Sequence, residues 1–394
     1  MSWAEHKLGE FISIKHGWAF KGEFFAEDGK YLLLTPGNAH ETGGLKLRPG
    51  KEKFYTGEFP DEFLMKAGDI LVVMTDLIQT APILGGAIVV PEDDRYLHNQ
   101  RLGLVESLPN RTIDKTFLYY VLNSSMYRGQ VRGSATGATV RHTAPKRICD
   151  CMVLIPDLLK EQQRIGAVLG AYDDLIALNR RRIVLLEDAA RRLYREWFVH
   201  LRFPGHETVP VTNGVPRGWV IKPLSDVAPL NYGKALKATE RKGGKVPVYG
   251  SSGIVGWHDA AFLEAGAIVV GRKGNVGSLY YSHVPSFPID TVFFIKPETA
   301  SFFLFLALHQ LNFISSDSAV PGLNRNYAHS LPVLIPNGEV AKMFEHQVSP
   351  LFEQMHTLDT QNARLARARD LLLPKLMSGQ LDISGIALPE EAAA

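Results

Sequence analysis

Cysteine is scarce in this sequence, and no long apolar run occurs in it. The only two cysteines among its 394 residues, Cys149 and Cys151, lie one residue apart in a strand-like segment. Neighbouring thiols on one strand rarely form a disulfide, and no His or Cys stands at ligand spacing beside them. The longest apolar runs, such as residues 302–308, are far shorter than the roughly 20 residues that cross a bilayer. The first residues have neither a basic nor an apolar signal region. We therefore expect a reduced, cytoplasmic protein without a metal site or a membrane span.

Motifs of nucleotide chemistry are also missing. The Asn/Asp-Pro-Pro-aromatic tetrad expected of an amino-methyltransferase does not occur. Residues 271–278, Gly-Arg-Lys-Gly-Asn-Val-Gly-Ser, lack the Gly-Lys-Ser/Thr ending of a phosphate-binding loop. This segment fits a tight turn between strands, and it equally fits contact with a nucleic-acid backbone through its amides and Arg272 or Lys273. The histidines are scattered, and adjacent acids such as Asp93 and Asp94 point to different faces. The sequence predicts no catalytic centre.

An internal repeat organises the chain. Residues Val153-Leu154-Ile155-Pro156 return unchanged at 333–336, and each copy precedes a long helical segment. Earlier in each half, four residues recur at one constant offset in the numbering: Trp3, Leu8, Gly17 and Ala19 match Trp219, Leu224, Gly233 and Ala235. Fixed-offset similarity of this kind indicates a duplicated structural unit. We expect two copies of one plan, a globular domain followed by a helix.

The two helical segments, residues 159–197 and 340–376, have apolar residues at alternating steps of four and three. This spacing is typical of the seam of a coiled coil. The first seam comprises Ile165, Leu169, Tyr172, Ile176, Asn179, Ile183, Leu186, Ala190, Leu193 and Trp197. The second comprises Phe344, Val348, Leu351, Met355, Leu358, Asn362, Leu365, Arg369, Leu372 and Leu376. Either alone fits a helix packed on its own domain, but two favour an antiparallel pair whose asparagines fix the register. Pro350 predicts a kink or a break in the second helix.

The predicted fold class is α+β. Short apolar runs bounded by Gly and Pro indicate strands in the first part of each half, and each strand-rich domain leads into one of the paired helices. The expected boundaries are a first domain at 1–156, a central helical spacer at 157–200, a linker at 201–215, a second domain at 216–336, a distal helical spacer at 337–380 and a tail at 381–394. Residues 390–394 are expected to be disordered. A seam of this length spans roughly 50 Å, which exceeds the ~34 Å of one turn of B-DNA.

Basic and small residues before each Ile-Pro indicate DNA binding. The loop 133–142 ends in Arg141-His142, and the loop 318–327 contains Asn324-Arg325. Glycine lets a backbone approach a ligand closely, while Arg and Asn make bidentate contacts with guanine and adenine. One such loop alone fits a solvated surface segment with an incidental Arg, but recurrence in both halves favours DNA contact. The candidate DNA-binding residues are Lys15, His16, Arg101, Thr139, Arg141, Lys234, Lys237, Arg272, Lys273, Asn324 and Arg325.

In the order of its motifs, the sequence resembles the specificity subunit of type I restriction–modification enzymes over essentially its whole length. The segments that carry the resemblance are 3–10, 216–226, 248–256, 271–277, 290–291, 155–165, 193–198 and 369–379. The resemblance implies two target-recognition domains that read one half each of a bipartite, asymmetric target in double-stranded DNA. It also implies that the helices set the spacing and dock two copies of a DNA methyltransferase subunit. The residues expected in the spacer seam and in partner docking are Ile165, Tyr172, Asn179, Ile183, Leu193, Trp197, Leu358, Asn362, Leu365 and Leu372.

The resemblance further implies a non-catalytic subunit that binds no cofactor of its own. S-adenosylmethionine, ATP and Mg²⁺ are expected on partner subunits, including a motor–nuclease subunit that joins the complex for restriction in phage defence. The first domain lacks the Tyr-Gly-Ser-Ser-Gly segment and the Gly-Arg-Lys-Gly turn of the second, with Met74-Thr75-Asp76 in place of the turn. The two domains are therefore expected to read different sequences. The alternatives are a modification-only or other phage-defence complex, a DNA-modifying enzyme with an unfamiliar active site, and an assembly protein that does not touch DNA.

Overall fold

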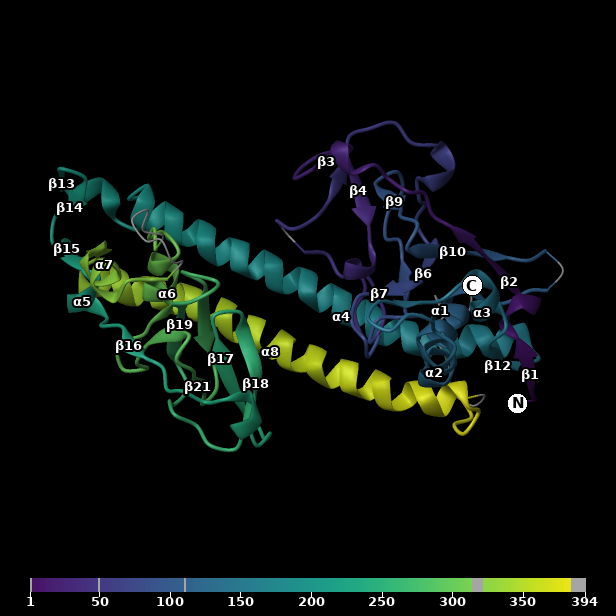
Figure 1. The fold of residues 1–394 in the computed structure, drawn as a ribbon. Helices are drawn as coiled ribbons and strands as arrows, with labels where there is room; N and C mark the ends of the chain where they lie inside the picture. Colours follow the sequence, from purple (N-terminus) through teal and green to yellow (C-terminus); the bar gives the residue numbers. More distant parts are fainter. Residues whose placement is uncertain (1, 49, 110, 314–321, 384–394) are drawn as a thin grey trace. The chain divides into compact units, whose positions relative to one another are not determined.

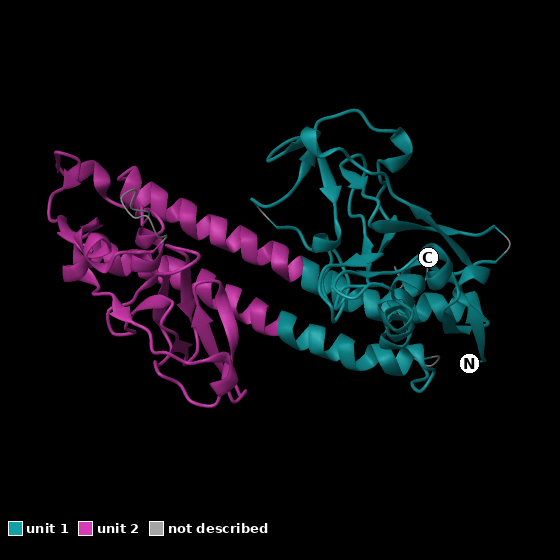
Figure 2. Ribbon diagram, viewed as in Figure 1, with its two compact units in different colours: residues 1–177, 362–394 teal, residues 178–361 magenta. Residues whose placement is uncertain are grey.

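The computed structural model describes residues 2–48, 50–109, 111–313 and 322–383, which form two compact units. The first unit comprises residues 1–177 and 362–394, and the second comprises residues 178–361 (Figure 2). Each unit holds one strand-rich domain together with parts of two long helices, α4 (Leu159–Tyr194) and α8 (Gly338–Met377). The predicted spacers are thus divided between the units, and the predicted domain boundaries stay predictions. The predicted disordered tail at 390–394 lies outside the described residues.

An antiparallel four-stranded sheet forms the centre of the first unit. Its strands, in the order β2-β10-β6-β8, are Ile12–His16, Leu102–Ser107, Ile70–Val73 and Ala87–Val89. All four residues of β6 are buried, because Ile70 and Val72 enter one apolar core while Leu71 and Val73 enter another. Alternate residues of a strand point to opposite faces, so a strand with a core on each side reads as a continuous apolar run.

Smaller elements complete the first unit (Figure 1). A second four-stranded sheet has the order β3-β5-β4-β9: Phe25–Ala26, Phe54–Tyr55, Tyr31–Leu34 and Tyr96–His98. Two further pairs join β1 (Trp3–Lys7) to β12 (Met152–Pro156) and β7 (Thr75–Asp76) to β11 (Arg141–His142). The short helices are α1 (Lys115–Asn123), α2 (Ser125–Gly133) and α3 (Pro145–Cys149). Asp114 caps α1 by accepting a hydrogen bond from the Phe117 N–H.

The second unit follows the same plan. Its central antiparallel sheet has the order β16-β22-β19-β20: Asn231–Tyr232, Val292–Ile295, Ala267–Gly271 and Leu279–Ser282. The accompanying sheet contains β18 (Gly253–His258), β17 (Val246–Gly250) and β21 (Phe287–Pro288). The remaining strands are β13 (Val211–Thr212), β14 (Val215–Pro216), β15 (Val220–Pro223) and β23 (Pro332–Ile335), and the short helices are α5 (Leu224–Val227), α6 (Phe302–Leu308) and α7 (Arg325–Ser330). The pair β15-β23 corresponds to β1-β12.

Gly17 and Gly233 show the repeat at atomic detail. A Cβ on Gly17 would lie 2.3 Å from the Asn99 carbonyl oxygen, and one on Gly233 would lie 2.0 Å from that of Ile289. The residues that follow, Trp18 and Lys234, form parallel bridges to the same two partners. Only a residue without a side chain permits this approach of two backbones. The repeated glycines therefore mark equivalent crossings of the chain.

The long helices pack antiparallel, as predicted. In the first unit the start of α4, with Ile165 and Leu169, shares a core with Leu376 at the end of α8. In the second unit Tyr194, near the end of α4, packs with Phe344 near the start of α8. Every predicted seam residue is buried or half-buried, and Trp197 lies on a π-helical turn, Arg195–Val199, that extends α4. The α+β fold class with paired helices is confirmed. Among the described residues, no helix combines the length and the apolar character of a membrane span.

The helix α8 does not break at Pro350. It continues as one α-helix through this position, so the predicted break is wrong. Proline leaves the carbonyl four residues earlier, that of His346, without its helical partner. Both Pro350 and His346 are exposed, so that carbonyl can be hydrated. In addition, the Ser349 hydroxyl donates a 2.7 Å hydrogen bond to the Glu345 carbonyl.

Candidate nucleic-acid interface

Loops from distant parts of the second unit meet at one end of its central sheet. The Leu323 N–H donates a 2.8 Å hydrogen bond to the Arg272 carbonyl, and Lys273 forms a bridge with Gly322. The Lys273 N–H also bonds to the Thr291 carbonyl, and the Lys234 N–H bonds to that of Pro288. These contacts join three segments that hold predicted DNA-binding residues, and the loop 288–291, into one group. We call this group the second loop cluster: residues 232–234, 271–275, 288–291 and 322–325.

Two arginines flank one tyrosine in the second loop cluster. The guanidinium carbons of Arg272 and Arg325 lie 5.2 Å and 5.0 Å from the centroid of the Tyr232 ring. Guanidinium groups are attracted to the face of an aromatic ring, and the Tyr232 side chain remains 49% exposed. The Arg272 guanidinium also donates to the Asp290 carbonyl at 2.9 Å. The two guanidinium groups thus place two positive charges beside a partly exposed flat ring.

The other predicted residues of the second unit have different local roles. Asn324 caps α7, because its side-chain oxygen accepts hydrogen bonds from the Asn326 and Tyr327 N–H groups. The ammonium of Lys234 lies 3.9 Å from the centroid of the Phe262 ring. Lys237 is exposed and precedes a short turn, where its N–H bonds to the Glu240 carboxylate. Of the predicted loop 318–327, residues 318–321 lie outside the described residues.

The corresponding loops meet in the first unit. The Gly17 N–H donates to the Leu102 carbonyl, and the Met74 N–H donates to that of Arg101. Arg141 lies opposite Asp76 in the antiparallel pairing of β11 with β7, and the Thr143 N–H donates a hydrogen bond to the Met74 carbonyl. The sheet therefore places the predicted residues His16, Arg101 and Arg141 in one first loop cluster, which comprises residues 16–18, 74–80, 98–101 and 136–143.

Individual side chains of the first loop cluster differ in their freedom. His16, Arg101 and Thr139 are exposed. The Lys15 ammonium, beside the cluster, pairs with the Glu62 carboxylate at 2.7 Å. The guanidinium of Arg141 donates to the carbonyls of its own loop at Arg132, Ala135 and Gly137, at 3.1–3.3 Å. Arg141 therefore shapes the loop that carries Thr139.

Two features of the clusters are not indicated by the sequence. Tyr232 could not be predicted, because a single tyrosine in a short strand has no distinguishing pattern. Leu77 and Ile78 follow the apolar β6 and the polar β7 in sequence, and both are exposed. Their position directly after Met74-Thr75-Asp76 was the available signal, since this segment replaces the basic turn of the second domain. No described residues form a group of three or more His, Cys, Asp or Glu side chains that could hold a metal ion.

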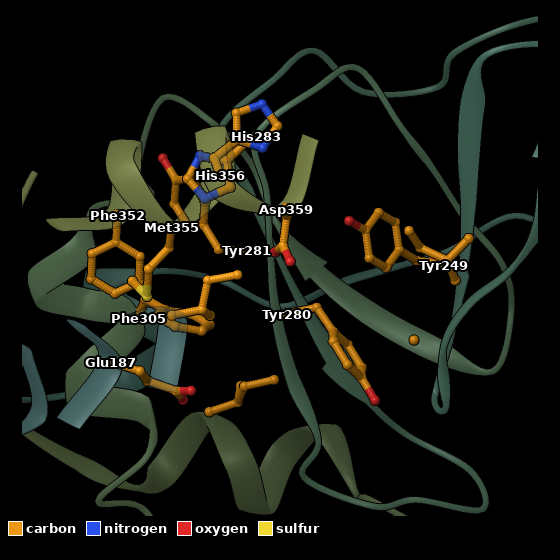
Figure 3. Close-up of a pocket in the computed structure, with 14 residues that line it drawn as sticks. Glu187, Tyr249, Tyr280, Tyr281, His283, Phe305, Phe352, Met355, His356 and Asp359 are labelled. Carbon is orange, nitrogen blue, oxygen red and sulfur yellow. The ribbon is translucent and has the colours of Figure 1, made fainter. Parts of the chain in front are cut away.

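The second unit also contains a cavity of about 470 Å³ between β17–β20 and the two long helices (Figure 3). Its walls are largely aromatic, with Tyr280, Tyr281, Phe305 and Phe352 among the lining residues. The rings of His283 and His356 stack with centroids 4.6 Å apart, and burial together with the His356 charge lowers the pKa of His283 to about 4. The predicted DNA-binding residues do not line this cavity, so it is separate from the loop cluster.

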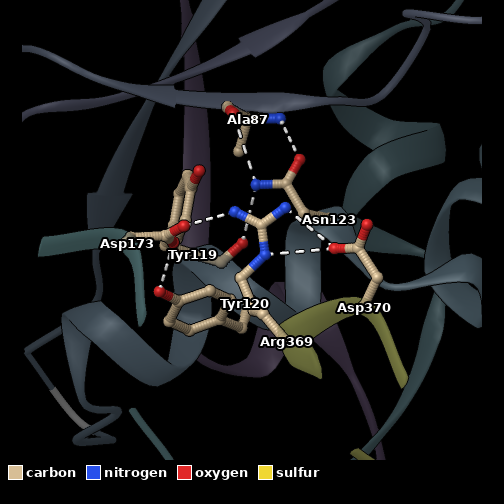
Figure 4. A network of polar contacts seen from close by, with 7 residues as sticks. All are labelled: Ala87, Tyr119, Tyr120, Asn123, Asp173, Arg369 and Asp370. Carbon is tan, nitrogen blue, oxygen red and sulfur yellow. Dashed lines mark hydrogen bonds and ion pairs between the residues drawn. The ribbon is translucent and has the colours of Figure 1, made fainter. Parts of the chain in front are cut away.

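A polar network holds the strand-rich domain of the first unit to the helices α4 and α8 (Figure 4). Arg369 of α8 pairs with Asp173 of α4, and the same carboxylate accepts a 2.5 Å hydrogen bond from the Tyr120 hydroxyl of α1. Burial and the nearby Asp173 charge raise the pKa of Tyr120, so its hydroxyl stays protonated as the donor. Asn123 extends this connection toward the sheet by exchanging hydrogen bonds with the Ala87 backbone.

Comparisons with known proteins agree with this architecture. Residues 1–188 and 216–357 match the family described as the type I restriction modification DNA specificity domain. The chain is similar to the HindI specificity subunit of Haemophilus influenzae, with 22% identity over 96% of this chain and 99% of that subunit. It is also similar to the MjaIX specificity subunit of Methanocaldococcus jannaschii, with 21% identity over 71% of this chain and 72% of that subunit.

A solved structure has the same fold. The S subunit of the type I restriction–modification system from M. genitalium aligns with a TM-score of 0.60 and 19% identity, over 98% of this chain and 97% of that chain. The family match spans both copies of the repeat, including the parts that hold the two loop clusters. The chain therefore belongs to the type I restriction–modification DNA specificity family.

Proposed function

We propose that this chain reads a bipartite, asymmetric DNA target, with each recognition domain contacting one half. The observation that supports this most directly is the pair of loop clusters, which occupy equivalent places on the two duplicated sheets. Their side chains differ: the second cluster presents the half-buried Arg272 and the exposed Arg325 over Tyr232, together with the exposed Lys273, and the first presents the exposed His16 and Arg101. Arg reads guanine edges or binds phosphate, and tyrosine supplies a flat apolar surface. Different side chains at one structural position are what two different half-sites require.

In this proposal the chain is a non-catalytic subunit that positions the catalytic ones. S-adenosylmethionine is bound by the methyltransferase partners, and ATP and Mg²⁺ by the motor–nuclease subunit. Membership in the DNA specificity family supports this division of labour. The contribution of this chain is then to hold the two half-sites at a fixed spacing through the paired helices α4 and α8.

We assign partner docking to the outer face of α4. The predicted seam residues are buried or half-buried within the units, which leaves them little surface for a partner. Beside the seam in the second unit, Leu178 and Leu185 are exposed and lie seven residues apart, so they share one face of the helix. Clustered apolar residues on a surface mark protein–protein contacts. Two copies of a methyltransferase subunit are the expected partners.

Methylome sequencing tests this function. Cells that carry this chain with its neighbouring methyltransferase should show one bipartite methylated motif, and deletion of the chain should abolish it. Exchange of residues 1–156 for the matching domain of a relative should change only one half of the motif. A methylome that is unchanged by the deletion would contradict the proposal. Restriction of unmodified phage then distinguishes a complete restriction–modification complex from a modification-only complex, which would leave the phage intact.

A further inference from the structure

The turn that follows β7 in the first unit exposes two large apolar side chains. Leu77 is 64% exposed and Ile78 is 55% exposed, and the polar residues Gln79 and Thr80 that follow them are exposed as well. We call residues 77–80 the apolar turn. Exposed aliphatic side chains of this size are normal when they are scattered, but two in succession at the tip of one turn form a small apolar patch.

The apolar turn is held in place from both ends. The buried Asp76 carboxylate accepts hydrogen bonds from the Ile78 N–H at 3.0 Å and from the Ile83 N–H at 2.8 Å. Ala81, which closes the turn, is buried in the core, and its N–H bonds to the Ile78 carbonyl. The buried Arg128 guanidinium donates to the Pro82 carbonyl. Because buried polar contacts fix the turn, Leu77 and Ile78 are presented in one orientation. In a flexible loop, these side chains could instead pack against the protein surface.

The apolar turn is part of the first loop cluster. Asp76 lies opposite Arg141 in the antiparallel pairing of β7 with β11, and the nearby Met74 N–H donates a hydrogen bond to the Arg101 carbonyl. In the second unit β19 is the counterpart of β6, and it leads into Arg272-Lys273-Gly274, which stand in the place of Met74-Thr75-Asp76. The connections that follow β6 and β19 therefore expose aliphatic groups in one domain and positive charge in the other. A difference of this kind between equivalent connections is expected of residues that select the sequence.

We propose that the apolar turn reads an A·T base pair in the half-site of the first domain, an inference that rests on the proposed function. Leu77 and Ile78 contact the 5-methyl group of thymine, and the Gln79 amide bonds to N6 and N7 of adenine. Thymine is the only base that presents a methyl group, and it does so in the major groove. Gln is suited to a bidentate contact with adenine in the same groove. The exposed side chains of Arg101 and His16 in the same cluster are then placed beside the DNA backbone.

The test measures DNA binding by the complex of the full chain with its methyltransferase subunits. The duplexes carry the target found by methylome sequencing, and each thymine of the first half-site is replaced in turn by deoxyuridine, which lacks only the methyl group. For the unmodified chain, one such replacement should weaken binding by about three- to tenfold. The double variant Leu77→Ala/Ile78→Ala should bind the thymine duplex as weakly as the unmodified chain binds the deoxyuridine duplex. For this variant, replacing thymine by deoxyuridine should cause no further loss of binding. Likewise, 7-deazaadenine at one position should weaken binding by about tenfold, and Gln79→Ala should remove this sensitivity.

Two controls and the contrary outcomes complete the design. Leu158→Ala replaces a leucine of similar exposure, 62%, that lies just before α4, and it should leave every duplex unaffected. A base replacement in the second half-site should weaken binding by the same factor for the turn variants as for the unmodified chain. The proposal is overturned when the variants weaken binding to all duplexes equally. It is also overturned when the loss does not depend on the thymine methyl group, which would indicate that Leu77 and Ile78 insert between base pairs instead. A complex that shows no preference for a bipartite target contradicts the proposed function instead.

Discussion

The Arg369 guanidinium of α8 forms a salt bridge with the Asp173 carboxylate of α4, and this salt bridge connects the two long helices within the first unit. Both side chains are mostly buried, with 19% and 30% of their surface exposed. Burial disfavours the charged guanidinium, but the hydrogen bond to Asp370 and the attraction to Asp173 outweigh it and raise the pKa of Arg369. Arg369 occupies a seam position that is otherwise apolar, so its charge must be satisfied within the helix pair.

Asp173→Asn should destabilise the first unit. The substitution removes the opposite charge and leaves the guanidinium with Asp370 as its remaining acid, at a cost of about 1–2 kcal/mol in the free energy of unfolding. Urea denaturation of the full chain measures this difference. Asp188→Asn is the matched control, because Asp188 pairs with Arg192 on the exposed surface of α4 at 2.7 Å. That exposed pair should contribute less than about 0.5 kcal/mol, and equal losses in the two variants would contradict the argument.

Alanine at either repeated glycine should destabilise its own domain. The Cβ of Gly17→Ala or Gly233→Ala would overlap a backbone carbonyl, which can move only by disturbing the adjacent parallel bridge. We expect each variant to lose about 1–3 kcal/mol of unfolding free energy, measured by thermal unfolding. The control is Gly129→Ala in α2, where no neighbouring atom lies within 4 Å of the new Cβ. Alanine is the better helix former, so this variant should gain up to about 1 kcal/mol. A stable Gly17→Ala protein would show that the crossing is adaptable.

Much of the fold could be predicted because periodic patterns survive in the sequence. The seam from Ile165 to Trp197 and the repeated Val-Leu-Ile-Pro segment each record which face of an element is buried, and both predictions agree with the structure. The glycine pair was visible as a repeat, although its cause, a carbonyl in contact with the backbone, required coordinates.

The loop clusters were less predictable, because their form depends on contacts between distant segments. The sequence places Arg272 and Arg325 more than fifty positions apart, and nothing in the numbering indicates that both lie over Tyr232. Arg141 was selected for its charge, yet its donors are engaged by three carbonyls that only a folded loop brings together. Pro350 predicts a kink or a break in α8, but the helix continues through this position without a break, and the exposed His346 carbonyl can be hydrated there.

Stability should fall as the pH is lowered from about 6.5 toward 4, in part because of His98. The His98 ring is fully buried and its Nε2 lies 2.9 Å from the Leu102 carbonyl oxygen. Burial lowers the pKa of His98 to about 4, while an unfolded histidine has a pKa near 6.5. Between these values the unfolded chain binds a proton that the folded chain does not, so the free energy of unfolding decreases as the pH falls. The full effect is on the order of 3 kcal/mol.

Urea denaturation at pH 7, 6 and 5 measures the contribution of His98. His98→Gln retains an N–H donor for the Leu102 carbonyl but cannot be protonated in this range, so its pH dependence should be shallower by about one proton. The control variant His346→Gln replaces an exposed histidine that does not contribute to the His98 pKa, and it should leave the contribution of His98 to the slope unchanged. Identical slopes for His98→Gln and the unmodified chain would show that His98 is protonated equally in both states.

Arg325→Gln should weaken DNA binding by the assembled complex, and the manner of the loss identifies the contact. Arg325 is exposed at the start of α7 and lies over Tyr232, so its charge is available at the surface of the second loop cluster. A contact with a phosphate predicts a uniform loss across target sequences and a salt dependence reduced by about one ion, whereas a contact with guanine predicts a loss of about 1–3 kcal/mol at one position of the second half-site. Binding measured from low to high salt, on targets altered at single positions, distinguishes these results. Arg217→Gln removes an exposed arginine from the turn before β15, outside the cluster, and serves as the control. Equal binding by the two variants would remove Arg325 from the interface and leave Lys234, Arg272 and Lys273 as the cations of that cluster.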